Sequence, residues 1–181
     1  MDAVRGMIQS PGPHTVLIAG SGPDGVSEWA NSGLTPVTLD IDERNKPDIV
    51  GSMTNIGECG PFDAVYCCHA LEHLYPHEVN RAMEEFRRVL RPGGVLIIVV
   101  PDLEGVQPDC RVLPDYPGGV RMCGLHLFYG DFTQIEEFPH MAHHCGFIAE
   151  TLLDALFQGG FSRCKSERMG GYNLMGVGIK E

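Results

Sequence analysis

Short apolar runs that end at glycines are the clearest pattern along the chain. Residues 15–19 form an aliphatic run that stops at the glycine-rich segment 20–25, which predicts a buried strand followed by a tight turn. Residues 95–100 are continuously aliphatic, as is typical of the centre of a parallel sheet covered on both faces. Further strands are predicted at residues 37–39, 48–50, 62–67, 161–167 and 173–180.

Segments with helical spacing lie between these runs. Apolar residues recur every three or four positions from 77 to 90, so this segment is predicted to be a helix with one face on a sheet. Shorter helices are expected over residues 26–32 and around 152–157. Alternating strands and helices predict an α/β fold with a doubly wound sheet, closed by a hairpin of its last two strands.

The regular pattern is lost between residue 101 and about residue 130, where proline and glycine are frequent. Connections of this length in a compact domain are usually functional or mobile. We therefore expect one domain over residues 1–181, in which residues 102–145 form an insertion that acts as a lid or as the acceptor site.

Composition and charge narrow the class of protein. The 181 residues fit one domain, and 43% hydrophobic with 20% charged residues is typical of a soluble protein with a packed core. The net charge of -11 disfavours nucleic acid or an anionic membrane as a partner, because phosphate groups bind cationic surfaces. No apolar run approaches the roughly 20 residues of a membrane span. The seven cysteines show no paired C-x-x-C spacing, so we expect a cytoplasmic protein with reduced thiols.

The ends of the first two predicted strands carry residues that suit a nucleoside ligand. Gly20 and Gly22 allow the backbone to approach a ligand closely in the turn before a helix. Asp40 ends the second strand, where a carboxylate can accept hydrogen bonds from both hydroxyls of a ribose. Because Gly25 completes the pattern G-x-G-x-x-G, NAD is an alternative ligand at this point.

Three later segments carry a resemblance to a known family. They are Phe-Asp-Ala-Val-Tyr-Cys-Cys-His-Ala-Leu-Glu-His-Leu at 62–74, Phe-Arg-Arg-Val-Leu-Arg-Pro-Gly-Gly at 86–94, and the aliphatic run that follows. Together they resemble the class I S-adenosylmethionine-dependent methyltransferases, of the small bacterial methyltransferase-11 type, over residues 15–102. The resemblance implies a Rossmann-like, seven-stranded sheet of order 3-2-1-4-5-7-6 with an antiparallel last strand. It also implies S-adenosylmethionine as cofactor.

The resemblance further implies which residues contact the cofactor. They are Gly20, Ser21 and Gly22 beside its methionine and ribose, Asp40 at the ribose hydroxyls, Ile41 against the adenine, Ser52 and Met53 at the adenine edge, and Cys68 and His69 at the sulfonium end.

The chain departs from the family pattern at three positions. Ile18 stands where many members carry an acidic residue, Asp24 replaces the third glycine of G-x-G-x-G, and Ser52 stands where aspartate is common. Each change removes a polar contact, so a non-catalytic binding or assembly module with a blocked or empty cofactor cleft is an alternative function. An NAD-linked oxidoreductase is disfavoured, because its two-part fold normally needs a longer chain.

The segment His69-Ala-Leu-Glu72-His73 also matches H-x-x-E-H, the motif of inverted zinc proteases, in which a helix aligns two histidines. Here the match begins at the end of a strand, and the sequence identifies no third ligand. We therefore predict no metal site and interpret Glu72 and His73 as polar groups held by the local fold.

Methyl transfer to a hydroxyl group benefits from a base, and neutral imidazole suits this role near pH 7. His126 is the first candidate because it follows the long connection, and His69, His143 and His144 are the others. The acceptor is expected to be a small molecule, such as a sugar or a cell-surface polymer precursor, with a homodimer as a second source of acceptor contacts. The aromatic residues expected to line the acceptor pocket are Tyr116, Phe128 and Tyr129.

Overall fold

The structure is a computed structural model that describes residues 6, 14–23, 29, 33–114, 116 and 121–181. The helix expected over residues 26–32 lies outside the described residues, apart from Trp29. The departure from the family pattern at Asp24 also lies outside them.

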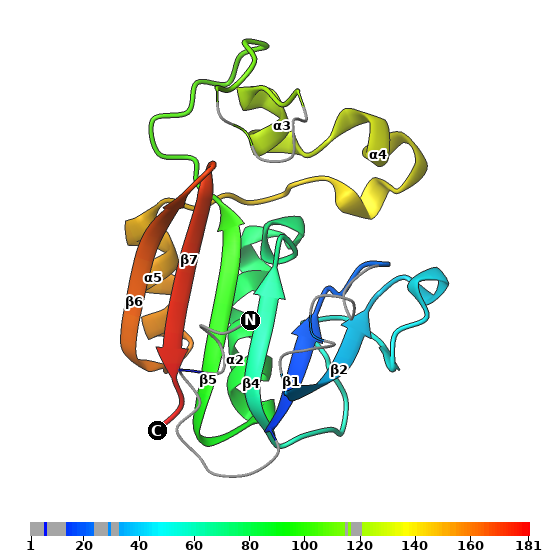
Figure 1. Cartoon of the computed structure of the whole chain (residues 1–181), viewed down its shortest axis with the longest axis vertical. Coiled ribbons are helices and arrows are strands. Elements are labelled where there is room, and N and C mark those ends of the chain that lie inside the picture. Colours follow the sequence, from blue (N-terminus) through cyan, green and yellow to red (C-terminus); the bar gives the residue numbers. More distant parts are fainter. Residues whose placement is uncertain (1–5, 7–13, 24–28, 30–32, 115, 117–120) are drawn as a thin grey trace.

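A seven-stranded sheet of order β3-β2-β1-β4-β5-β7-β6 runs through the molecule (Figure 1). The first five strands pair in parallel, whereas β7 is antiparallel to both β5 and β6. This arrangement confirms the predicted α/β class, the strand order and the reversed last strand. The strands are β1 (His14–Ala19), β2 (Leu34–Asp40), β3 (Ile49–Val50), β4 (Phe62–Cys68), β5 (Leu90–Pro101), β6 (Ser162–Gly170) and β7 (Asn173–Ile179).

Helices α2 (Pro76–Val89) and α5 (Ala149–Gln158) lie on the same face of the sheet (Figure 1). Phe86 of α2 and Leu152 of α5 are fully buried between the helices and the sheet, in one apolar cluster with Leu17 of β1 and Leu96 of β5. The neighbouring strand residues, such as Ile97, belong to a second apolar cluster. Successive strand residues point to opposite faces, so residues 95–100 of β5 are apolar because both faces of the strand are buried.

The start of β5 differs from the sequence prediction. The segment 91–94 was expected to be a turn between helix and strand, but β5 already begins at Leu90, which pairs with Phe62. The pairing then shifts, and it resumes at Val95 opposite Ala64. Gly93 has a φ of 77°, a conformation that favours glycine, so the expected turn is accommodated as an irregularity inside the strand.

The remaining helices are short and lie near the carboxyl ends of the parallel strands. Figure 1 shows α3 (Gly124–Tyr129) and α4 (Phe132–Glu137) beyond that edge of the sheet. The 3-10 helices η2 (Glu43–Asn45), η3 (Leu71–His73) and η5 (Pro139–Met141) complete the connections. Within the described part of the chain, no helix is long and apolar enough to cross a membrane.

Replacing Phe86 by alanine tests the packing of α2 on the sheet. Phe86 is 0% exposed, so Phe86→Ala is expected to lower the free energy of unfolding by about 3–5 kcal/mol through lost burial and the cavity left behind. Phe157→Ala is the control, because Phe157 is 55% exposed and its loss should cost less than about 0.5 kcal/mol. Urea unfolding of both variants measures the difference, and equal losses would contradict the packing described.

Candidate active site

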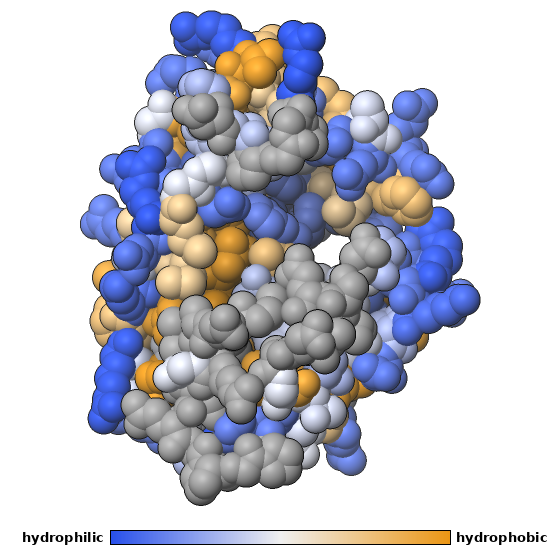
Figure 2. Space-filling model, in the orientation of Figure 1, coloured by the Kyte–Doolittle hydropathy of each residue, from blue (hydrophilic) through white to orange (hydrophobic). Residues whose placement is uncertain are grey.

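A cavity of about 480 Å³ lies at the carboxyl ends of β1, β2 and β4. The space-filling view shows the surface hollowed between α4 and the ends of β1 and β2 (Figure 2). β1 pairs with β2 on one side and β4 on the other, so this is the point where the strand order reverses. Open α/β sheets bind their ligands at such a point, and the volume is that of a small-molecule site.

The loop after β1 approaches the rest of the site closely because of Gly20. The N–H groups of Gly20 and Ser21 both donate to the Leu39 carbonyl, at 2.9 and 3.1 Å. Gly20 has a φ of 71°, and a Cβ on it would lie 2.3 Å from the Cβ of Ala70. Only glycine therefore allows the loop to pass this close to the chain that follows β4.

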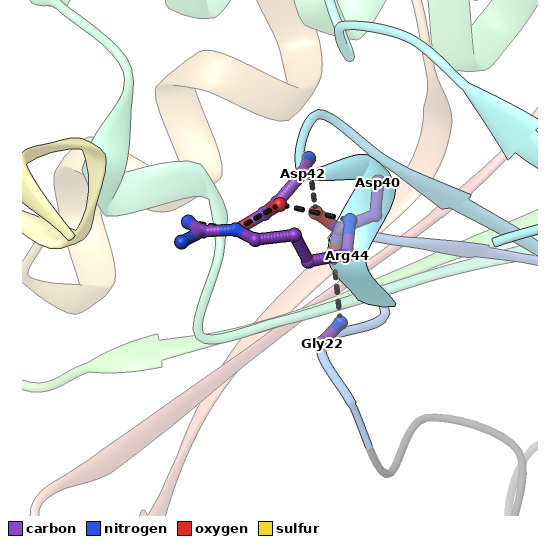
Figure 3. Close-up of polar contacts among 4 residues, drawn as sticks. All are labelled: Gly22, Asp40, Asp42 and Arg44. Carbon is purple, nitrogen blue, oxygen red and sulfur yellow. Dashed lines mark hydrogen bonds and ion pairs between the residues drawn. The ribbon is translucent and has the colours of Figure 1, made fainter. Parts of the chain in front are cut away.

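The carboxylate of Asp40 joins two loops of the site (Figure 3). Its Oδ2 accepts a hydrogen bond from the Gly22 N–H, and its Oδ1 accepts one from the Asp42 N–H, both at 2.8 Å. The side chain is buried, yet a carboxylate has about four acceptor positions, so each oxygen can still accept from a ligand hydroxyl. Asp40 therefore orders the first loop and keeps capacity for a ribose.

Arg44 connects the loop after β2 to Phe138, which lies between α4 and η5. Arg44 pairs with Asp42 at 2.6 Å, and the hydrogen bonds that it donates lower the pKa of Asp42 to about 2 (Figure 3). The same guanidinium lies over the ring of Phe138, 4.6 Å from the ring centroid. Phe138 lines the cavity, so Arg44 bridges the sheet edge and the segment that closes over it.

His69 ends the opposite wall of the cavity. The backbone N–H of His69 donates to the Val99 carbonyl at 2.8 Å, and the backbone of His69 has a φ of 49°. Burial of the ring lowers its pKa, but the contact of Nδ1 with Oε1 of Glu72, at 3.3 Å, outweighs this, so the pKa of His69 is raised. His69 is therefore a stronger base than a free imidazole.

The structure brings together all nine residues that the resemblance assigned to the cofactor. They lie along one cavity, which runs from the loops after β1 and β2 to the loop after β4: Gly20, Ser21, Gly22, Asp40, Ile41, Ser52, Met53, Cys68 and His69.

Comparison with known families gives a match over the centre of the chain. Residues 19–98 match the model of a methyltransferase domain. This match includes β2, β3 and β4 and the lining loops that follow β1, β2 and β4. A comparison with curated protein sequences gave no match.

Solved structures resemble the whole chain. The 1,6-didemethyltoxoflavin-N1-methyltransferase of Burkholderia thailandensis, crystallised with 1,6-didemethyltoxoflavin and S-adenosylhomocysteine, is 16% identical, with a TM-score of 0.63 over 93% of this chain and 71% of that one. An S-adenosylmethionine-dependent methyltransferase of Mesorhizobium loti is 18% identical, with a TM-score of 0.66 over 98% and 95%. One of Archaeoglobus fulgidus is 16% identical, with a TM-score of 0.67 over 93% and 87%.

Residues 19–98 therefore match a methyltransferase domain, and the chain as a whole has the fold of S-adenosylmethionine-dependent methyltransferases. The matched domain and the strand order agree with the resemblance seen in the sequence. Two of the three departures from the family pattern, Ile18 and Ser52, lie among the described residues.

Those two departures leave the cavity open. Ile18 is buried in the apolar cluster with Val16 and Trp29, so its side chain fills core space. Ser52 lines the cavity, and its hydroxyl lies 2.9 Å from the Thr54 hydroxyl. Neither residue blocks the cavity. The alternative of a non-catalytic module with a blocked cofactor cleft therefore gains no support from these two positions.

The structure does not bring His126 to the cavity lining. His126 lies in α3, where its Nδ1 accepts a hydrogen bond from the Cys123 N–H at 3.0 Å and its ring packs on Phe132. With Nδ1 accepting, the neutral ring carries its proton on Nε2 and has no free lone pair to act as a base. The geometry thus gives no support to His126 as the catalytic base.

The expected acceptor residues also lie elsewhere. None of Tyr116, Phe128 and Tyr129 is among the residues that line the cavity, and Tyr129 is exposed. The insertion 102–145 nevertheless reaches the cavity through a later part, which the sequence analysis missed because it has no clear periodicity. The lining residues from this part are Gln134, Phe138, His140 and Met141.

Gly20→Ala tests the close approach of the loop after β1 to Ala70. We expect a larger loss of stability than for Gly22→Ala, measured by urea unfolding. Both positions have positive φ and share a backbone cost of about 1–2 kcal/mol, but a Cβ on Gly22 meets nothing within 4 Å.

The second change Ala70→Gly serves as the control, because it removes the atom that the new Cβ would strike. The double variant Gly20→Ala/Ala70→Gly should regain stability relative to Gly20→Ala alone. Equal losses for Gly20→Ala and Gly22→Ala would show that the described contact does not matter.

Proposed function

We propose that the protein transfers a methyl group from S-adenosylmethionine to a small-molecule acceptor. The observation that carries this proposal is the Asp40 carboxylate at the end of β2, opposite a glycine loop at the reversal of strand order. The cofactor would lie along the cavity, with its ribose at Asp40 and its adenine against the exposed Ile41. Its sulfonium would then face Cys68 and His69.

The residues present suit this cofactor chemically. Both oxygens of Asp40 have acceptor capacity for the two ribose hydroxyls, and Gly22 leaves open space beside the loop. The carboxylates of Asp40 and Asp42 also favour a ligand that carries positive charge. When bound, S-adenosylmethionine supplies a methyl group that a cationic sulfur already activates.

The residues of the chain would mainly position the acceptor and exclude water. In-line displacement needs the acceptor atom aligned with the methyl group, and alignment accounts for much of the acceleration in such reactions. Phe138 and Met141 provide apolar walls on the covering side, and Gln134 provides an amide. We assign His69 as the residue that takes the proton from a hydroxyl acceptor, because it lines the cavity and its pKa is raised.

The finer features of the acceptor and the cell compartment are part of this proposal. A sugar or a cell-surface polymer precursor would offer the hydroxyl groups that a base at His69 can activate. All seven cysteines are free, which supports a reducing compartment such as the cytoplasm. The net charge of -11 argues against a nucleic-acid acceptor. A homodimer would supply further acceptor contacts.

Calorimetric titration with S-adenosylmethionine tests the proposal. We expect one binding site per chain, and we expect Asp40→Asn to raise Kd about 10- to 100-fold, because hydrogen bonds to a charged group are lost. Glu43→Gln removes a neighbouring exposed charge outside the cavity lining and should leave Kd unchanged. Absence of binding at millimolar ligand would exclude methyl transfer and favour the non-catalytic module.

A further inference from the structure

Glu72 differs from the other buried carboxylates in the described part of the chain. Asp40, Asp63 and Asp102 each accept a hydrogen bond from a backbone N–H. Glu72 is 1% exposed, yet neither of its oxygens has a hydrogen-bond partner among the described residues. Nδ1 of His69 lies 3.3 Å from Oε1 of Glu72, which is the contact described above. A buried carboxylate in this condition is costly unless a cation completes its surroundings.

Two histidines lie beside this carboxylate. One ligand atom from each of Glu72, His73 and His143 lies within 4.8 Å of the others. The rings of His73 and His143 meet edge to face, with their centroids 5.0 Å apart. His73 also lines the cavity, so the group borders the proposed reaction site.

Both rings are held with a free lone pair. Nδ1 of His73 lies 3.2 Å from the Ala142 carbonyl, and Nδ1 of His143 lies 2.9 Å from the Leu127 carbonyl. A carbonyl can only accept, so in its neutral form each ring carries the proton on Nδ1 and has its lone pair on Nε2. Histidines that bind metals are typically oriented in this way by a backbone carbonyl.

Backbone hydrogen bonds hold the three residues together before any ligand binds. The carbonyl of Glu72 accepts from the N–H groups of His144 and Cys145, at 2.9 and 3.2 Å. The N–H of His143 donates to the Tyr129 carbonyl at 3.1 Å. The segment after η5 is therefore fixed to η3, and the group is ordered by main-chain contacts on both sides.

We propose that Glu72, His73 and His143 bind one divalent transition-metal ion at the wall of the cavity. Two imidazoles and one carboxylate form a ligand set that suits zinc and its neighbours in the first transition row, whereas Mg²⁺ prefers oxygen ligands. Three protein ligands leave at least one position open for a water molecule or an acceptor oxygen. This proposal replaces the expectation that the chain holds no metal site.

The ion would also restrict the chemical class of the methyl acceptor. This part of the proposal rests on the proposed methyl transfer. A hydroxyl group bound to the ion has a lowered pKa and passes its proton to His69. Its oxygen then forms the new bond to the methyl carbon as the bond from that carbon to sulfur breaks. The products are a methyl ether and the neutral thioether S-adenosylhomocysteine. The metal thus favours an oxygen acceptor over an apolar carbon acceptor.

Metal binding can be measured without any turnover. The full chain, stripped with a chelator, is titrated with Zn²⁺, Co²⁺, Mn²⁺ and Mg²⁺ by calorimetry, and Co²⁺ is followed by its visible absorption. We expect one transition-metal ion per chain, with Mg²⁺ binding weakest. Glu72→Gln and His143→Ala should each weaken Zn²⁺ binding at least about 10-fold, as loss of a ligand does.

Matched variants separate this site from general surface binding. Glu84→Gln and His77→Ala remove an exposed carboxylate and an exposed imidazole of α2, and they should leave Zn²⁺ affinity unchanged. Zn²⁺ should raise the melting temperature of the wild-type chain but not that of Glu72→Gln. If one variant fails to fold, the other ligand variant and the wild-type titration still decide the question.

The metal site and the methyl transfer can fail separately. No binding of any transition metal by a chain that binds S-adenosylmethionine would overturn the metal site and leave the proposed function standing. Metal binding that is equally strong in Glu72→Gln and His143→Ala would also overturn it. A chain that binds Zn²⁺ through these residues but does not bind S-adenosylmethionine would retain the metal site and lose the methyltransferase function.

Discussion

The reversal of strand order between β1 and β4 determines where everything else in the site can lie. From β1 the chain crosses to β2 on one side, and after β3 it returns to β4 on the other. Loops that leave the carboxyl ends of β1 and β4 therefore turn away from each other and open a crevice. Gly20 narrows this crevice by its approach to Ala70, and Asp40 fixes its second edge.

Most of the fold could be predicted from the sequence because the central strands are buried on both faces. The aliphatic run at 95–100 and the helical spacing over 77–90 identify β5 and α2, although the first residues of β5 were expected to be a turn. Asp40 could also be identified from the sequence, because its separation from the glycine loop is the length of one crossover connection and the strand that follows it. Local features of this kind are visible to pattern analysis.

The Glu72 group could not be identified in the same way. His143 lies 71 positions after Glu72, in a segment without periodicity, and only the tertiary fold brings the two together. His126 was preferred as a base because of its position after the long connection. The structure instead gives its Nδ1 a hydrogen bond from the Cys123 N–H, a contact that the residue type does not reveal.

The carboxylates of Asp40 and Glu72 lie at the same edge of the sheet but have different surroundings. The difference distinguishes a carboxylate that orders a loop from one that suits ligand binding. Asp40 is already held by two backbone N–H groups, so it would order its loop even without a cofactor. Glu72 is held in place by its main chain, while its carboxylate has no hydrogen-bond partner among the described residues. Such an arrangement is stabilised when a cation arrives from outside, and the imidazoles of His73 and His143 are oriented for that cation. The stability of this wall and its reactivity would then depend on the same ion.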